Sequence, residues 1–200
     1  MSNSQYIQNR WQISGLRRRP QAVTFADNFG ILDSGLLVPE GTEFENFIIL
    51  SDHNRSPIDI SKQRLENKQR MVSGSMRSYH IADKNTFSWS WDELPSRAFS
   101  GDPEFDPETG IATANGLTPF TVDGGAGGVD IVKWYEDHPG SFYMFLSYDR
   151  FDRFSTDKYN RFQQYNDVVE VLFSSFEFSV SRRGGNTHDF WNISISLEEV

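Results

Sequence analysis

The sequence predicts a mostly β fold with one α-helix, and three observations support this prediction. Aromatic residues make up 14% of the chain, with 17 Phe, 7 Tyr and 5 Trp, and aromatic side chains suit the half-buried surface of a pleated strand. Several segments alternate apolar and polar residues, as strands with one buried face do. Only one segment has apolar residues at helical spacing. A chain of 200 residues buries roughly 70% of its unfolded surface as one unit, so we expect a single domain over residues 1–200.

The N-terminal part of the chain is weakly patterned. Residues 22–41 contain three glycines and a proline, and such punctuation favours loops. We therefore expect residues 1–43 to form an N-terminal arm with at most one short strand. Residues 44–51, FENFIILS, are a compact apolar run that is typical of a strand.

A long polar segment follows, over residues 58–84. Residues 61–71 are charged and fit either a helix or a strand, whereas the small residues and Gly74 of residues 71–81 disfavour a helix. We expect the segment to be mostly extended. Residues 85–94 then alternate clearly, with Phe87, Trp89 and Trp91 on one face. This pattern predicts a strand with one buried side.

Residues 99–115 are expected to form a loop, because they combine two prolines, two glycines and four carboxylates. Charge is segregated along the sequence. Residues 101–130 hold six acidic residues and no Lys or Arg, whereas residues 62–84 hold six Lys or Arg against two acidic residues.

One helix is expected, over residues 129–138. Its apolar positions share one face: Ile131, Trp134, Tyr135 and His138. A Pro-Gly pair ends it. In residues 141–148 both odd and even positions are apolar, which is typical of a central strand with two buried faces. A helix that leads directly into such a strand should pack on the sheet.

The C-terminal third predicts a long β-hairpin. After a polar excursion over residues 148–165, the apolar positions of residues 167–183 change parity near residues 174–175. This change predicts a β-bulge there, because one extra residue exchanges the two faces of a strand. Residues 184–186, Gly-Gly-Asn, suit the turn, and residues 189–199 alternate through the second strand.

Composition narrows the classes of function. The formal net charge is −9, which argues against tight, sequence-independent binding of nucleic acid; the basic run Arg17–Arg18–Arg19 is interpreted as a solvated or interface segment. The chain has no Cys, which excludes disulfides and a cysteine nucleophile. No run of about 18 apolar residues could span a bilayer, so we expect no membrane contact.

Motifs for chemistry are weak, so we expect no catalytic residue, no metal ligand and no cofactor. Residues 123–128, DGGAGG, precede the helix, where backbone amides can bind phosphate, but they lack the spacing of phosphate loops and are interpreted as a tight turn. The alternating carboxylates of residues 102–108 resemble a calcium loop, yet Pro107 stands where such a loop needs Gly. No GxSxG elbow is present, and the histidines lack zinc-site spacing: His53, His80, His138 and His188.

The tryptophans support an alternative function of another class, a carbohydrate-binding β-sandwich module. Trp89, Trp91, Trp134 and Trp191 would form a sugar-stacking platform if they were exposed. Each lies in an alternating or helical apolar pattern, so we expect them in the core instead.

Several stretches resemble tail proteins of long-tailed bacteriophages. These are SWSWDELPSR at residues 88–97, VDGGAGGVDIVKWYEDHPGSFYMFLSY at 122–148 and RRGGNTHDFWNISISLEEV at 182–200. SDHNRSPI at residues 51–58 and QRMVSGSMRSYHIADK at 69–84 also resemble segments of such virion proteins.

The resemblance implies a fold of the tail-tube type, a β-sandwich or half-barrel with one flanking helix and long extended loops. It also implies a structural virion protein in which six copies form a ring and stacked rings make the conduit for phage DNA delivery. The expected partners are copies of the chain and other tail proteins, such as sheath, terminator or baseplate. Double-stranded DNA would pass through the lumen without specific binding, and assembly would take place in the cytoplasm of the host bacterium. The alternative within this class is a baseplate, distal-tail ring or tube-end protein.

The same resemblance implies that residues 58–84 are an extended loop that contacts another subunit. Segregated charge suggests how, because basic and acidic patches attract across an interface. We expect the basic residues of one copy to face the acidic residues of a neighbour: Lys62, Arg64, Lys68 and Arg70 on one side, and Asp102, Glu104, Asp106 and Glu108 on the other.

Overall fold

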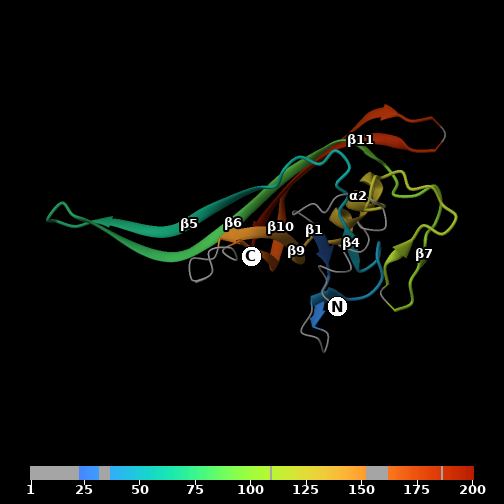
Figure 1. Ribbon diagram of the computed structural model, residues 1–200. Coiled ribbons are helices and arrows are strands. Elements are labelled where there is room, and N and C mark those ends of the chain that lie inside the picture. The colour runs from blue at the N-terminus through green and yellow to red at the C-terminus, as the bar shows by residue number, and fades with distance from the viewer. Residues whose placement is uncertain (1–22, 32–36, 109, 152–161, 186) are drawn as a thin grey trace.

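A seven-stranded antiparallel sheet, in the order β4-β1-β9-β10-β11-β6-β5, forms most of the protein (Figure 1). The computed structural model describes residues 23–31, 37–108, 110–151, 162–185 and 187–200. The sheet consists of β1 (Val23–Ala26), β4 (Phe47–Ile49), β5 (Asp59–Arg70), β6 (Met76–Pro95), β9 (Phe142–Phe151), β10 (Phe162–Arg183) and β11 (Asp189–Glu199). Two small sheets pair β2 (Phe29–Ile31) with β3 (Leu37–Pro39) and β7 (Glu104–Phe105) with β8 (Ala112–Thr113). The helix among the described residues is α2 (Gly128–Asp137). The mostly β, sandwich-like fold with one helix is therefore confirmed.

The large sheet is strongly curved. Strands β1 and β6 stand four places apart in the sheet order, which in a flat sheet would separate them by about 19 Å. The rings of Phe25 on β1 and Trp89 on β6 nevertheless lie 6.2 Å apart. The sheet must therefore curl around a common core, as in a half-barrel.

Aromatic side chains fill the inside of this curve, and α2 packs against it. Phe25 contacts Phe142 of β9, with ring centroids 4.9 Å apart, and Trp134 of α2 at 6.3 Å. Trp91 is fully buried, and its indole Nε1 donates to the backbone oxygen of Ser51 at 2.8 Å. Burial of these large side chains supplies much of the hydrophobic stabilisation of the fold.

The patterned segments form the predicted elements. The helix is shifted by one residue toward the N-terminus relative to the predicted 129–138. β11 has the predicted bounds, and β9 lies inside the sheet, as predicted for a central strand. The register between β10 and β11 shifts between Phe173 and Ser175, which confirms the predicted bulge. Beyond the shift, Phe176 pairs with Ile195, so apolar residues on both sides of the shift, Phe173 and Phe176, pack against the core.

The expected N-terminal arm over residues 1–43, with at most one short strand, contains three strands in the structure, β1, β2 and β3, and β1 belongs to the core. All four residues of β1 are buried, and the strand pairs with β4 on one side and β9 on the other. VTFA is too short to show alternation, and its Thr24 is buried with its neighbours, so no pattern marked it as a strand. Residues 1–22 lie outside the described residues.

Other boundaries also differ from the predictions. The expected excursion over residues 148–165 is wrong at both ends, because β9 extends to Phe151, which pairs with Phe162 of β10; residues 152–161 lie outside the described residues. The strand expected over residues 44–51 is shorter, because Phe44 has a positive φ of 68° and belongs to a turn. The predicted loop over residues 99–115 contains β7 and β8.

Candidate functional site

The hairpin of β5 and β6 projects far from the rest of the molecule (Figure 1). The last pair between β11 and β6 is Glu198 with Thr86. From Lys62 to Arg70, β5 pairs with β6 and with no other strand of the described residues, and at about 3.3 Å per residue this part extends for about 30 Å. The predicted extended segment is therefore one long two-stranded arm over residues 62–85, here called the hairpin.

The end of the hairpin is a closed turn. The backbone N–H of Met71 donates to the oxygen of Ser75, and that of Gly74 donates to the oxygen of Met71, both at 2.8 Å. Gly74 has a φ of 82°, in the left-handed region that glycine adopts without steric strain. Residues 70–77, called the tip below, thus have a defined shape.

The four predicted basic residues of the hairpin lie on one face. All occupy even positions of β5, and alternate residues of a strand point to the same side: Lys62, Arg64, Lys68 and Arg70. The hairpin supplies carboxylates for two of them. Arg64 Nε lies 3.0 Å from Asp83 Oδ1, and Lys68 Nζ lies 2.5 Å from Glu66 Oε1.

These local ion pairs change the charge available to a neighbour. The hydrogen bond from Arg64 is the main reason that the pKa of Asp83 is lowered, and Lys68 has the same effect on Glu66. Lys62 and Arg70 make no ion pair within the part of the chain that the structure describes. Uncompensated positive charge therefore remains at the base of the hairpin, at Lys62, and at its end, at Arg70.

The predicted acidic residues lie on the loop around β7, at the side of the molecule opposite the tip (Figure 1). Glu104 Oε2 accepts from Asn115 Nδ2 at 3.0 Å, and Asp106 Oδ1 accepts from the backbone N–H of Glu108 at 2.9 Å. Over the described residues, no three His or acidic residues are grouped so that they could hold a metal ion. The basic and acidic sets do not meet within one copy.

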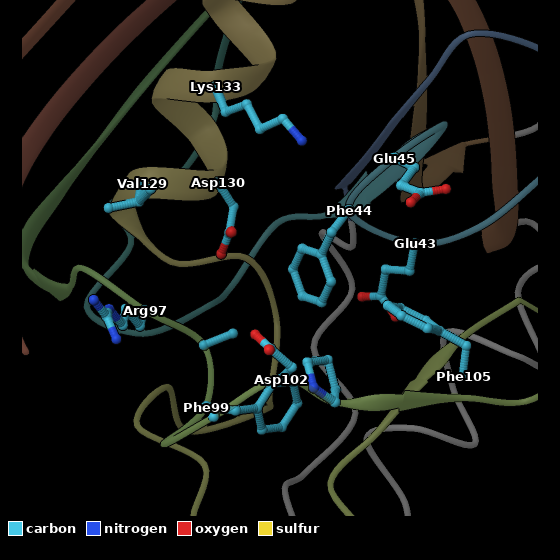
Figure 2. Close-up of a pocket in the computed structure, with 13 residues that line it drawn as sticks. Glu43, Phe44, Glu45, Arg97, Phe99, Asp102, Phe105, Val129, Asp130 and Lys133 are labelled. Atoms are coloured by element: carbon cyan, nitrogen blue, oxygen red, sulfur yellow. The ribbon is translucent and has the colours of Figure 1, made fainter. Parts of the chain in front are cut away.

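A pocket of about 560 Å³ opens next to the N-terminus of α2 (Figure 2). Segments that are distant in sequence line it: the turn before β4, the loop after β6 and the first turns of the helix. The lining residues used below are Glu43, Phe44, Phe99, Asp102, Phe105 and Asp130. Figure 2 shows the carboxylates of Asp102 and Asp130 pointing toward the same space beside the Phe44 ring.

Two carboxylates of this pocket, called the helix pocket below, accept hydrogen bonds from backbone amides. Asp130 Oδ2 accepts from the N–H of Gly127 at 2.8 Å, which caps the helix, and Glu43 Oε2 accepts from the N–H of Ala112 at 2.7 Å. Burial raises the pKa of Asp130 to about 6, and the charge of Glu43 adds to this effect. The Gly127 hydrogen bond opposes it. No spacing in the sequence connects these residues.

The glycine-rich residues 123–128 form a tight turn and do not form a phosphate loop. Asp123 accepts from Ser51 Oγ at 2.7 Å and from the backbone N–H of Asp52 at 2.8 Å, which ties the turn to the end of β4. The N–H groups of Ala126 and Gly127 donate to Ile49 and Asp130 within the chain. These amides are therefore engaged by the fold itself.

The four tryptophans within the described residues do not form a sugar-binding platform. Trp89, Trp91 and Trp134 are at most 4% exposed, and Trp191 is half-buried and stacks on Phe178 with centroids 5.3 Å apart. These four side chains pack with the core, as their sequence pattern predicts. Residues 17–19 lie outside the described residues.

Comparison with known proteins gives no relative. No model of a protein family matches the chain, and no curated protein matches it. Over the described residues, no helix has the length and apolar character needed to span a bilayer.

Proposed function

We propose that the chain is a structural subunit that assembles head to tail with copies of itself, and that this assembly is a bacteriophage tail tube. The projecting hairpin is the observation that carries the proposal. Catalysis is not part of the proposal.

The exposed apolar surface and the open edge of the hairpin favour contact with another protein chain. A two-stranded hairpin is at best marginally stable alone in water, and this one exposes apolar side chains, with Met76 at 60% and Ile81 at 70% exposure. Contact with a second copy would remove these side chains from water. β5 is also the last strand of the sheet, and a long open edge favours pairing with another chain.

The distribution of charge supports a head-to-tail contact. The hairpin carries the basic residues at one end of the molecule and the loop around β7 carries the acidic residues at the other (Figure 1). A contact between two different surfaces repeats from copy to copy and closes into a ring when the rotation between copies permits.

The assignment to a phage tail rests on the resemblance of residues 51–58, 69–84, 88–97, 122–148 and 182–200 to tail proteins. A net charge of −9 fits a conduit that lets DNA pass, because like charges repel. In this proposal six copies form each ring, the rings stack, and the other tail proteins bind at the ends or around the tube. A ring that does not stack would instead fit the baseplate or distal-tail alternative.

Negative-stain microscopy of the purified chain tests the proposal. We expect rings with a central hole, stacked into tubes as the protein concentration rises. Isolated rings would select the baseplate or distal-tail alternative. Only monomers, at every concentration and salt condition, would contradict the assembly function altogether.

A further inference from the structure

We infer that the helix pocket of one copy is the socket for the hairpin tip of the next copy. This inference rests on the assembly proposed above and names the two surfaces that meet. It goes beyond a general attraction between basic and acidic segments, because it assigns the apolar turn at the tip to a cavity of matching character.

The pocket combines aromatic walls with negative charge. Phe44, Phe99 and Phe105 supply the walls, and its lining contains four carboxylates against the two cations Arg97 and Lys133. Asp102 is exposed at the rim, where it is accessible to an incoming chain. Aromatic rings and carboxylates together favour a ligand that has both apolar groups and a cation.

The tip has the complementary composition. From Arg70 to Arg77 the chain contains two cations and no carboxylate. Val72, at the end of the turn, is fully exposed, and Met71 and Met76 flank it. Arg70 and Arg77 stand beside these apolar side chains, and Arg70 pairs across the hairpin with Met76.

The dimensions agree as well. A pocket of about 560 Å³ lies within the range of about 300–1,000 Å³ that holds a compact ligand, so it has room for the side chains of a turn and not for a whole strand. The hairpin holds its tip about 30 Å beyond the sheet. The pocket of the same copy is lined by residues of α2 and of the loop that contains β7, and these elements lie on the opposite side of the molecule from the tip (Figure 1), so the contact is made between copies.

A disulfide test uses the fact that the chain contains no Cys. We expect the double variant Val72→Cys with Asp102→Cys to form a ladder of covalent oligomers on mild oxidation, because a disulfide needs the two Cα atoms within about 7 Å. The matched control is Val72→Cys with Asp92→Cys. Asp92 is exposed like Asp102 but lies on β6 outside the pocket, so this control should give no ladder.

Charge exchange gives a second readout on the assembled protein. Arg70→Glu and Asp102→Arg should each raise the concentration needed for assembly at least about tenfold, and the two together should restore most of it. Arg183→Glu, an exposed cation at the far end of β10, should have little effect.

The outcomes separate this inference from the proposed function. The socket would be overturned, and the assembly function would stand, if the wild-type chain assembles while both tests fail. The first test fails if the Asp102 and Asp92 cysteine variants cross-link equally or not at all. The second test fails if the charge exchange gives no rescue. A wild-type chain that stays monomeric would overturn both.

Discussion

At the scale of single residues, two features of the surroundings of Asp130 change its pKa in opposite directions. Its carboxylate caps α2 through the N–H of Gly127, which favours the charged form. Burial disfavours that form, and it outweighs the cap, because the pKa of Asp130 is raised to about 6. A structural helix cap therefore also acts as a group that binds a proton near neutral pH.

The stability of the fold should depend on this proton. In the unfolded chain the pKa of Asp130 is close to its ordinary 3.8, so between about pH 4 and pH 6 the folded protein holds a proton that the unfolded chain has lost. The contribution of Asp130 to stability is thus present below pH 4 and is lost as the pH rises through 6. A difference in pKa from 3.8 to about 6 corresponds to on the order of 3 kcal/mol.

Asp130→Asn tests this dependence, because the amide oxygen can still accept from Gly127 and carries no charge. Urea unfolding should show the variant gaining stability relative to wild type between pH 4 and pH 7.5. Asp92→Asn is the exposed control and should follow wild type. A difference between Asp130→Asn and wild type that stays constant with pH would contradict the account.

Close backbone contact explains one glycine of the turn before α2. A Cβ on Gly125 would lie 2.8 Å from the Cα of Ser51, and backbone atoms cannot move aside easily. Gly125→Ala should therefore lower the free energy of unfolding by about 1–3 kcal/mol. Gly140→Ala, where a Cβ would meet nothing within 4 Å, is the control, and equal thermal unfolding of the two variants would show that the close contact is unimportant.

At the scale of elements, alternation predicted more than composition did. β11 and the inner half of β6 were recognisable because every second residue is apolar, and the bulge in β10 was recognisable because that parity changes at Ser174. β1 could not be recognised, since four buried residues give no period. The outer halves of β9 and β10 could not either, because their polar sequence resembles a loop.

The two parts of the candidate site also differ in how far the sequence predicts them. The basic face of the hairpin follows from even positions in one strand, which the sequence shows directly. The helix pocket does not, since Glu43, Phe99 and Asp130 come from different segments that only the folded chain brings together. The positive φ of Phe44, which shapes the turn beside the pocket, has no signal in a phenylalanine.

Deletion of Ser174 tests the role of the bulge. Without the extra residue, either Val171 or Phe176 must turn away from the core, so we expect a loss of several kcal/mol or a failure to fold. Ser174→Ala, which removes only an exposed hydrogen bond to Glu198, should change stability by about 0.5 kcal/mol or less. Denaturant unfolding of the two variants compares them, and equal stability would show that the register shift is dispensable.

At the scale of the whole molecule, the curved sheet and the hairpin have different tasks. The curved sheet buries the aromatic core and is complete in one copy. The hairpin adds no buried residue to the core, exposes apolar side chains and extends the open edge of the sheet, and these features underlie our proposal that it contacts a neighbouring copy. Removing it should leave the fold intact and abolish assembly.

Sedimentation velocity of a trimmed chain tests this claim most directly. Ser61 and Thr86 are paired across the hairpin, so an Asn-Gly turn can replace residues 62–85 and join them. The account predicts that the trimmed chain keeps the circular dichroism of a β protein and sediments as a monomer, while wild type sediments as large oligomers at the same concentration. A trimmed chain that forms the same oligomers as wild type would contradict the central role of the hairpin.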